Sequence, residues 1–251
     1  MALEAAALAG QIILDAWGGA LRVETKADGT PVTEVDRACE AAIRGLLAMR
    51  FPADAIWGEE EGRSEGSGTR LWLVDPIDGT KSFVRGYPFF SVQIALMDAD
   101  GLRLGVSHAP VYGETAWAER DHGAYMDGVA IRVSDIDRLD RCTVSTGNLR
   151  RLASGPGWTK LGALLAIADR TRGYGDFLHY HLLASGRIDV VIESDLNILD
   201  IAALAVIIRE AGGTVTQLDG GAIGLGTSDL IASNGSLHAE VLASLATAAS
   251  R

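Results

Sequence analysis

Short apolar segments of strand or helix length recur along the whole chain, with no long polar linker between them. From about residue 133 strands and helices alternate, which is typical of an α/β arrangement. The strands are expected at residues 142–146, 188–193, 214–217 and 229–233, and the helices at residues 161–169, 177–185, 200–211 and from 237 onward. We therefore expect an α+β half over residues 1–132 and an α/β half over residues 133–251, packed as one unit.

Two helices and a set of short strands are expected in the first half. A helix over residues 3–17 ends at Gly18 and Gly19, and a second has apolar residues at helical spacing from 35 to 47 after a capping-box pair, Thr33 and Asp36. The strands are expected at residues 55–57, 71–74, 91–97, 102–108, 116–119 and 124–126, with the third and fourth forming a hairpin. Residues 61–70, rich in Gly, Ser and Glu, are predicted to be a mobile surface loop.

Composition limits the classes of function. A chain of 251 residues with 48% hydrophobic content can bury a full core, and its net charge of −11 disfavours nucleic acid and anionic membranes as partners. No uncharged apolar run approaches the ~18 residues that span a bilayer, and no basic segment precedes Arg22. Cys39 and Cys142 are isolated, which argues against a disulfide framework or a zinc site. We expect a cytoplasmic protein.

The segment 75–80 (DPIDGT) carries the first candidate chemistry. It follows the apolar strand 71–74 directly, and active-site residues commonly lie where a strand gives way to a loop. Asp75 and Asp78 can face one point, which is unfavourable unless a cation neutralises them, and such oxygen ligands suit Mg²⁺ or Mn²⁺. Taken alone, the segment also reads as an ordinary turn.

Three further acidic positions each have an ordinary explanation when taken singly. Glu59 belongs to a run of three Glu that reads as a solvated loop. Asp200 precedes an apolar helical segment, where Asp is a common N-cap, and Asp36 is a usual capping-box residue. The case for function is therefore their joint occurrence.

In their order along the chain, these segments resemble the inositol monophosphatase superfamily of Mg²⁺-dependent, lithium-sensitive phosphatases. The matching segments are residues 26–36 (KADGTPVTEVD), 58–60 (GEE), 72–83 (WLVDPIDGTKSF) and 200–204 (DIAAL). The resemblance covers nearly the whole chain. It implies a layered αβαβα sandwich, with most metal ligands in residues 1–132 and with Asp200 and the substrate-selecting residues in residues 133–251.

The resemblance also assigns metal ligands to matching positions. Glu59, Asp75 and the backbone carbonyl of Ile77 would hold one Mg²⁺. Asp75 would bridge to a second ion, completed by Asp78 and Asp200. Glu59 would also reach a third, looser ion, so two to three ions are expected, with Mn²⁺ as a substitute and Li⁺ as an inhibitor. Two cations bridged in this way lie about 3.5–4 Å apart and can stabilise both the entering and the leaving oxygen.

Catalytic roles follow from the same resemblance. Asp36 and Thr80 would form a hydrogen bond, so that Thr80 orients the attacking water and helps to deprotonate it, beside the metal ligand Glu59. The backbone N–H groups of Gly79 and Thr80 would hold the phosphate. The expected partner is a small phosphorylated substrate.

Several positions favour a substrate other than inositol phosphate. Residues 25–33, 81–83 (KSF) and 175–176 (GD) resemble the histidinol-phosphatase branch. The anionic pair Asp176 and Glu193 would suit a cationic amine or imidazole better than a neutral polyol. Arg172 could lie on the phosphate side, although a surface role is an equal alternative. Leu199, where the family usually has an aromatic residue, and residues 194–198 depart from the pattern and leave the substrate open.

The leading hypothesis is hydrolysis of L-histidinol phosphate to histidinol and phosphate, a step of histidine biosynthesis. The alternatives are an inositol-1-monophosphatase, a phosphatase of broad specificity for sugars or nucleotides, and a regulatory binding protein without catalysis. The resemblance suggests a homodimer, with residues 87–90 as one contact. His179 and His181 are expected to pack or to face solvent rather than to bind metal.

Overall fold

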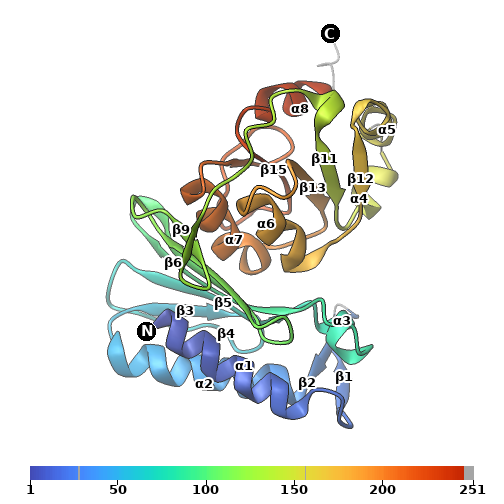
Figure 1. Ribbon diagram of the computed structural model, residues 1–251. Coiled ribbons are helices and arrows are strands. Elements are labelled where there is room, and N and C mark those ends of the chain that lie inside the picture. Colours follow the sequence, from blue (N-terminus) through green and yellow to red (C-terminus); the bar gives the residue numbers. More distant parts are fainter. Residues whose placement is uncertain (28, 156, 246–251) are drawn as a thin grey trace. The chain divides into compact units, whose positions relative to one another are not determined.

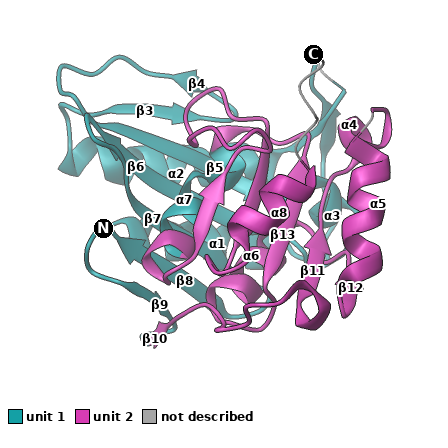
Figure 2. Ribbon diagram, turned by 90° about the horizontal axis from the view of Figure 1, so that it is seen from above, with its two compact units in different colours: residues 1–129, 199–207 teal, residues 130–198, 208–251 magenta. Residues whose placement is uncertain are grey.

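The computed structural model describes residues 1–27, 29–155 and 157–245 and divides into two compact units. Unit 1 comprises Met1–Val129 and Leu199–Ile207, and unit 2 comprises Ala130–Ile198 and Ile208–Arg251 (Figure 2). Asp28, in the family-like segment 26–36, lies outside the described residues. The division at residue 132 stays a prediction. In the structure, Asp200 is grouped with the other acidic residues of unit 1.

Unit 1 is built on a long mixed sheet with helices (Figure 1). In the described part of the chain the strand order is β10-β9-β8-β7-β6-β5-β3-β4, and β1 and β2 form a separate antiparallel hairpin. The strands are β1 (Val23–Thr25), β2 (Pro31–Thr33), β3 (Ala55–Gly58), β4 (Gly62–Arg63), β5 (Leu71–Asp78), β6 (Ser91–Asp98), β7 (Gly101–Ala109), β8 (Glu114–Glu119), β9 (Ala124–Met126) and β10 (Val129–Ile131). The helices are α1 (Ala2–Ala16), α2 (Glu34–Arg50), α3 (Thr80–Val84) and the unit 1 part of α7 (Ile198–Glu210).

Helices cover both faces of this sheet. A β-carbon at Gly10 of α1 would lie 2.3 Å from His108 of β7, and one at Gly105 of β7 would lie 2.3 Å from the carbonyl oxygen of Ala203 in α7. Positions 105 and 108 have opposite parity along one strand, so they face opposite sides of the sheet. The sheet therefore lies between α1 and α7, and the apolar residues of β5 are buried on both faces.

The predicted helix signals are confirmed in this unit. Thr33 and Asp36 form the capping box of α2, since each side chain accepts a hydrogen bond from the backbone of the other. Helix α1 ends before Gly18, which has φ of 78°. The buried stripe of α2 joins the core of α1 and the sheet through Ile43 and Leu47. None of the described helices is both long and apolar enough to span a bilayer.

Unit 2 is built on a smaller mixed sheet. Its described strands are in the order β12-β11-β13-β15-β14, with β11 parallel to β12 and β13, and with β15 antiparallel to both of its neighbours. The strands are β11 (Thr143–Thr146), β12 (Arg170–Arg172), β13 (Val190–Ser194), β14 (Thr214–Thr216) and β15 (Asp229–Ser233). The helices are α4 (Arg150–Ala153), α5 (Gly157–Ile167), α6 (Asp176–Ala184), α8 (His238–Leu245), the 3₁₀ helix η1 (Leu139–Arg141) and the remainder of α7.

The structure confirms the predicted β6–β7 hairpin and corrects two details. Helix α7 begins at Ile198, two residues before Asp200, because Ile198 and Leu199 are themselves buried. Residues 61–70 lie mostly in an exposed loop, as predicted, but Gly62–Arg63 form β4, which pairs with β3. A β-carbon at Gly66 would lie 2.4 Å from the backbone nitrogen of Ala55, so this glycine allows close packing against the start of β3.

Candidate active site

The end of β5 and the turn after it hold the segment DPIDGT. Strand β5 continues through Asp75 and Asp78, and its register with β6 shifts between these two residues. Gly79 then has φ of 92° and precedes α3. A β-carbon at Gly79 would also lie 2.5 Å from the carbonyl oxygen of Phe89, so both conformation and packing require glycine here. The segment is thus a bulged strand end followed by a short helix, where the segment taken alone also reads as an ordinary turn.

Three carboxylates meet at this strand end. Asp75, Asp78 and Asp200 each place one carboxylate oxygen so that these oxygens lie within 4.8 Å of one another. Asp200 reaches this group from the first turn of α7. All three residues belong to unit 1. Asp200 follows Asp78 by 122 residues in the sequence, and the fold brings the two carboxylates together.

The electrostatics of the cluster favour a cation. Asp75 is 2% exposed. Burial raises its pKa well above the usual value, and the negative charges of Glu59, Asp78 and Asp200 raise it further. A divalent cation would remove this repulsion, and an all-oxygen donor set fits Mg²⁺ or Mn²⁺. The residues present therefore fit the metal that the sequence predicts.

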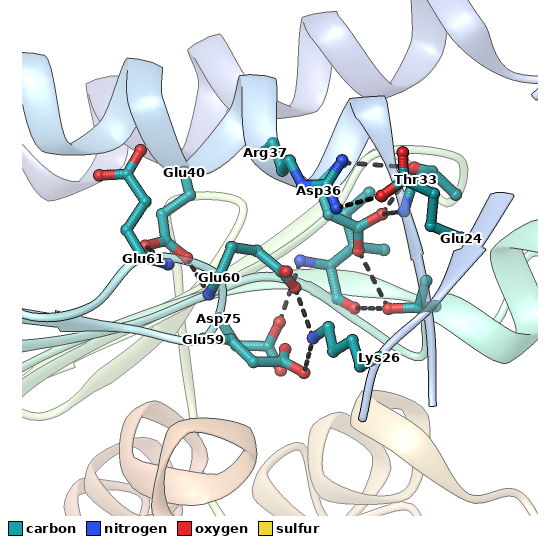
Figure 3. Close-up of polar contacts among 12 residues, drawn as sticks. Glu24, Lys26, Thr33, Asp36, Arg37, Glu40, Glu59, Glu60, Glu61 and Asp75 are labelled. Carbon is teal, nitrogen blue, oxygen red and sulfur yellow. Dashed lines mark hydrogen bonds and ion pairs between the residues drawn. The ribbon is translucent and has the colours of Figure 1, made fainter. Parts of the chain in front are cut away.

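Glu59 lies beside this cluster, and its carboxylate is bound by a lysine (Figure 3). Lys26 Nζ donates to Glu59 Oε1 at 2.8 Å and to Glu60 Oε1 at 2.7 Å. Burial alone lowers the pKa of Lys26, but its bonds to the two glutamates outweigh this and raise its pKa above the ordinary value. A lysine therefore provides positive charge at Glu59.

Thr80 lies between two acceptors. Its hydroxyl oxygen is 3.0 Å from Asp36 Oδ1 and 3.0 Å from the carbonyl oxygen of Ile77. Asp36 is buried, which raises its pKa, while the bonds that Thr33 and Thr80 donate to it favour the charged form. The Ile77 N–H in turn donates to Asp75 Oδ1 at 3.0 Å. The predicted Asp36–Thr80 pair is therefore in hydrogen-bond contact, next to the first carboxylate of the cluster.

The three substrate residues predicted in the second half lie along one sheet edge of unit 2. Strands β11, β12 and β13 run parallel, so their carboxyl ends meet at the same edge. Arg172 ends β12, Glu193 is the penultimate residue of β13, and Asp176 begins α6 shortly after β12. Arg172 is exposed and donates to the carbonyl of Thr171 at 2.7 Å.

Glu193 is held by three donors within unit 2. Oε2 accepts from Tyr180 Oη at 2.5 Å and lies 3.1 Å from His179 Nε2, and Oε1 accepts from the Asn148 N–H at 3.0 Å. Ser145 Oγ lies 3.3 Å from His179 Nδ1. Burial raises the pKa of Glu193, but these neighbours lower it to a net value below the ordinary one. Glu193 is therefore a fixed anion.

Sequence reasoning assigned no site role to four residues that contact the predicted ones or the turn that carries Glu59. They are Lys26, Glu40, His179 and Tyr180. Glu40 had a usable signal, because it lies on the helical stripe with Asp36 and Ile43, where a charged residue is unexpected. His179 and His181 are both buried, as one of the two predicted outcomes required, and His181 packs edge-on against Phe177.

The comparisons with known proteins agree with this geometry. The model of the inositol monophosphatase family matches residues 1–250. The chain belongs to this family. Its fold class is thereby confirmed: the extragenic suppressor protein suhB of Bartonella henselae superposes with a TM-score of 0.89 at 32% identity, over 97% of this chain and 96% of that chain. An inositol monophosphatase (IMPase) of Thermotoga maritima gives 0.87 at 34% identity, over 97% and 94%.

The relatives of this chain include a histidinol-phosphatase of Streptomyces coelicolor. It is 42% identical to this chain over 237 residues, which are 88% of this chain and 86% of that protein. An inositol-1-monophosphatase of Synechocystis sp. is 33% identical over 253 residues, 98% of this chain and 88% of that protein. The family is Mg²⁺-dependent, and the three aspartates of this chain form a carboxylate cluster suited to that metal.

Metal binding is expected to stabilise this protein against heat. A ligand that binds only the folded state at about 100 times its Kd adds about 2.7 kcal/mol, which in a chain of this size raises Tm by roughly 5–10 °C. Differential scanning calorimetry with and without MgCl₂ measures this shift. A rise that NaCl of equal ionic strength reproduces would contradict a specific site.

Proposed function

We propose that this phosphoric monoester hydrolase of the inositol monophosphatase family hydrolyses L-histidinol phosphate to histidinol and phosphate, in histidine biosynthesis. The reaction class rests above all on one observation, the convergence of Asp75, Asp78 and Asp200. The choice of substrate rests on identity, which is 42% to histidinol-phosphatases of Streptomyces coelicolor and Mycobacterium tuberculosis and 33% to the inositol-1-monophosphatase of Synechocystis sp..

Bound Mg²⁺ would supply charge stabilisation for the phosphoryl oxygens and lower the pKa of the attacking water. We assign its binding to Glu59, Asp75, the Ile77 carbonyl, Asp78 and Asp200, in two to three positions, with Mn²⁺ as a substitute and Li⁺ as an inhibitor. Lys26 donates a hydrogen bond to the Glu59 carboxylate. When Glu59 binds a cation, this bond would have to weaken, or the carboxylate would have to bind the lysine and the cation together.

In this proposal, Thr80 and Asp36 orient the attacking water and accept its proton. The Thr80 hydroxyl has one proton and two acceptors at equal distance. If Ile77 contributed its carbonyl to a cation, the Thr80 proton would be left for Asp36, and the Thr80 oxygen would be oriented to accept from the attacking water. The N–H groups of Gly79 and Thr80 belong to the start of α3, where the helix itself does not use them, and would hold the phosphate.

Asp176 and Glu193 would bind the cationic amine and imidazole of the substrate. The observation that supports this is the anionic state of Glu193, maintained by Tyr180, His179 and the Asn148 N–H. Arg172 remains a candidate for the phosphate side. We also propose a cytoplasmic homodimer; the two buried thiols, Cys39 and Cys142, fit a reducing compartment.

A substrate panel tests this proposal. We expect kcat/KM for L-histidinol phosphate to exceed that for inositol 1-phosphate by at least about tenfold, since a cation paired with a held anion adds roughly 1.5 kcal/mol or more of recognition. Phosphate release is measured with both esters, with a nucleoside monophosphate and with a sugar phosphate at saturating MgCl₂. A preference for inositol 1-phosphate would favour the inositol monophosphatase alternative. No turnover of any ester would favour a regulatory binding protein.

A further inference from the structure

A buried carboxylate of α2 lies directly against the turn that carries Glu59. Glu40 is 0% exposed, and its two oxygens accept from successive backbone N–H groups: Oε2 from Glu60 at 2.7 Å and Oε1 from Glu61 at 2.9 Å (Figure 3). The Glu59 N–H donates to the carbonyl oxygen of Val74 at 3.2 Å. Each N–H of the three-glutamate turn therefore has an acceptor, and Glu40 supplies two of the three.

Arg44, one helical turn further along α2, completes this contact. Its Nε donates to Glu40 Oε1 at 2.8 Å, and its Nη2 donates to the carbonyl oxygen of Gly62. The arginine side chain is itself largely buried, so it neutralises Glu40 at short range in a poorly solvated place. The pair thus binds the turn 59–61 and the residue after it.

The space for Glu40 is reserved by a glycine. A β-carbon at Gly58 would lie 2.1 Å from Glu40 Oε1 and 2.3 Å from its carboxyl carbon. Gly58 has no need of positive φ, since it lies in β3, so the absence of a side chain is explained by the carboxylate beside it. Packing and hydrogen bonding therefore point to the same role for Glu40.

We infer that Glu40, with Arg44, is a positioning residue that holds Glu59 toward Asp75, and this inference rests on the proposed role of Glu59 as a metal ligand. A turn fixed at each N–H restricts the backbone from which the Glu59 carboxylate extends. Glu40 has no contact with metal or substrate in this assignment. It acts on metal affinity through the turn, as groups that orient metal ligands commonly do.

The replacement Glu40→Gln tests this role with little change of shape. The amide keeps one acceptor oxygen but turns an NH₂ group toward a backbone N–H, so donor faces donor. We expect the Kd for Mg²⁺, measured by isothermal titration calorimetry without substrate, to rise by about 10-fold or more. At saturating MgCl₂, kcat and KM are expected to return to within about threefold of the wild-type values, because phosphate and substrate groups are untouched.

Asp54→Asn is the matched control. Asp54 is also a buried carboxylate paired with an arginine: it accepts from Arg70 Nε at 3.0 Å and from Trp72 Nε1 at 3.0 Å, just before β3 rather than at its end. Its replacement is expected to lower Tm and to leave the Mg²⁺ affinity unchanged. Equal Mg²⁺ affinities for wild type, Glu40→Gln and Asp54→Asn would overturn the inference.

Two more variants separate the inference from its premise. Glu59→Gln should weaken Mg²⁺ binding at least as much as Glu40→Gln; if it does not, the ligand role of Glu59 is wrong. If Glu59→Gln weakens binding and Glu40→Gln does not, the ligand stands and the positioning role fails. Should Glu40→Gln not fold, Arg44→Gln removes the bond to the Gly62 carbonyl and the ion pairs that Arg44 makes with Glu40 and Glu61. The inference expects this variant to bind Mg²⁺ more weakly than wild type, and an unchanged Mg²⁺ affinity would overturn it.

Discussion

Replacing Asp75 by Asn is expected to lower kcat/KM by at least about 10³-fold at any concentration of MgCl₂. Asp75 lies at the centre of the acidic group, with Asp78, Asp200 and Glu59 all close enough to raise its pKa. A ligand shared by two cations would contribute several kcal/mol of transition-state stabilisation, and about 4 kcal/mol corresponds to roughly 10³-fold. Steady-state phosphate release across a wide range of MgCl₂ measures the loss.

The same substitution should stabilise the metal-free protein. Without a cation, burial and the charges of Glu59, Asp78 and Asp200 disfavour the ionised carboxyl of Asp75, and Asn removes this ionisable group while keeping the shape. We therefore expect Tm in EDTA to rise for Asp75→Asn and to fall for Asp54→Asn, which loses an ion pair with Arg70. If Tm in EDTA falls equally for both variants, Asp75 serves structure rather than metal binding.

The parts of the fold that the sequence predicts best are those set by local signals. The capping box at Thr33 and Asp36 and the strand 229–233 are found where they are predicted, because hydrogen bonds within one turn determine the first and a short, fully buried apolar run determines the second. The hairpin of β1 and β2 was missed, since its strands of three residues carry too little pattern. The start of α7 was misplaced by two residues because burial of Ile198 extends the helix.

For the site, the sequence predicts which residues matter better than how they are held. Asp75, Asp78 and Asp200 were predicted from the resemblance, and the structure brings them together. Lys26 and Glu40 could not be paired with Glu59 or its turn from spacing, because both contacts depend on how β1, α2 and β3 approach one another in space. Contacts between elements far apart along the chain have no local signal.

Glu193→Gln is expected to lower kcat/KM for L-histidinol phosphate by about 10- to 150-fold, since a hydrogen bond to a charged group is worth about 1.5–3 kcal/mol. The glutamine has the same shape but no charge to attract a substrate cation. For p-nitrophenyl phosphate, which carries no cation, we expect a change of less than about threefold. Steady-state kinetics with both esters at saturating MgCl₂ measure the ratio, and the effect should appear mainly in KM if the cation is bound equally in ground and transition states.

A matched variant separates recognition from support of the fold. His238 is a buried histidine of the same unit, with hydrogen bonds to Thr216 and Ser233, so His238→Gln disturbs a comparable polar contact away from Glu193. His238→Gln should change kcat/KM by the same factor for both esters, whereas Glu193→Gln should change the ratio of kcat/KM for L-histidinol phosphate to kcat/KM for p-nitrophenyl phosphate. Tyr180→Phe keeps the charge of Glu193 but removes one of its three donors, so it should change the ratio in the same direction by less. An equal loss on both esters for Glu193→Gln would mean that the carboxylate supports β13 and α6 rather than selecting the substrate.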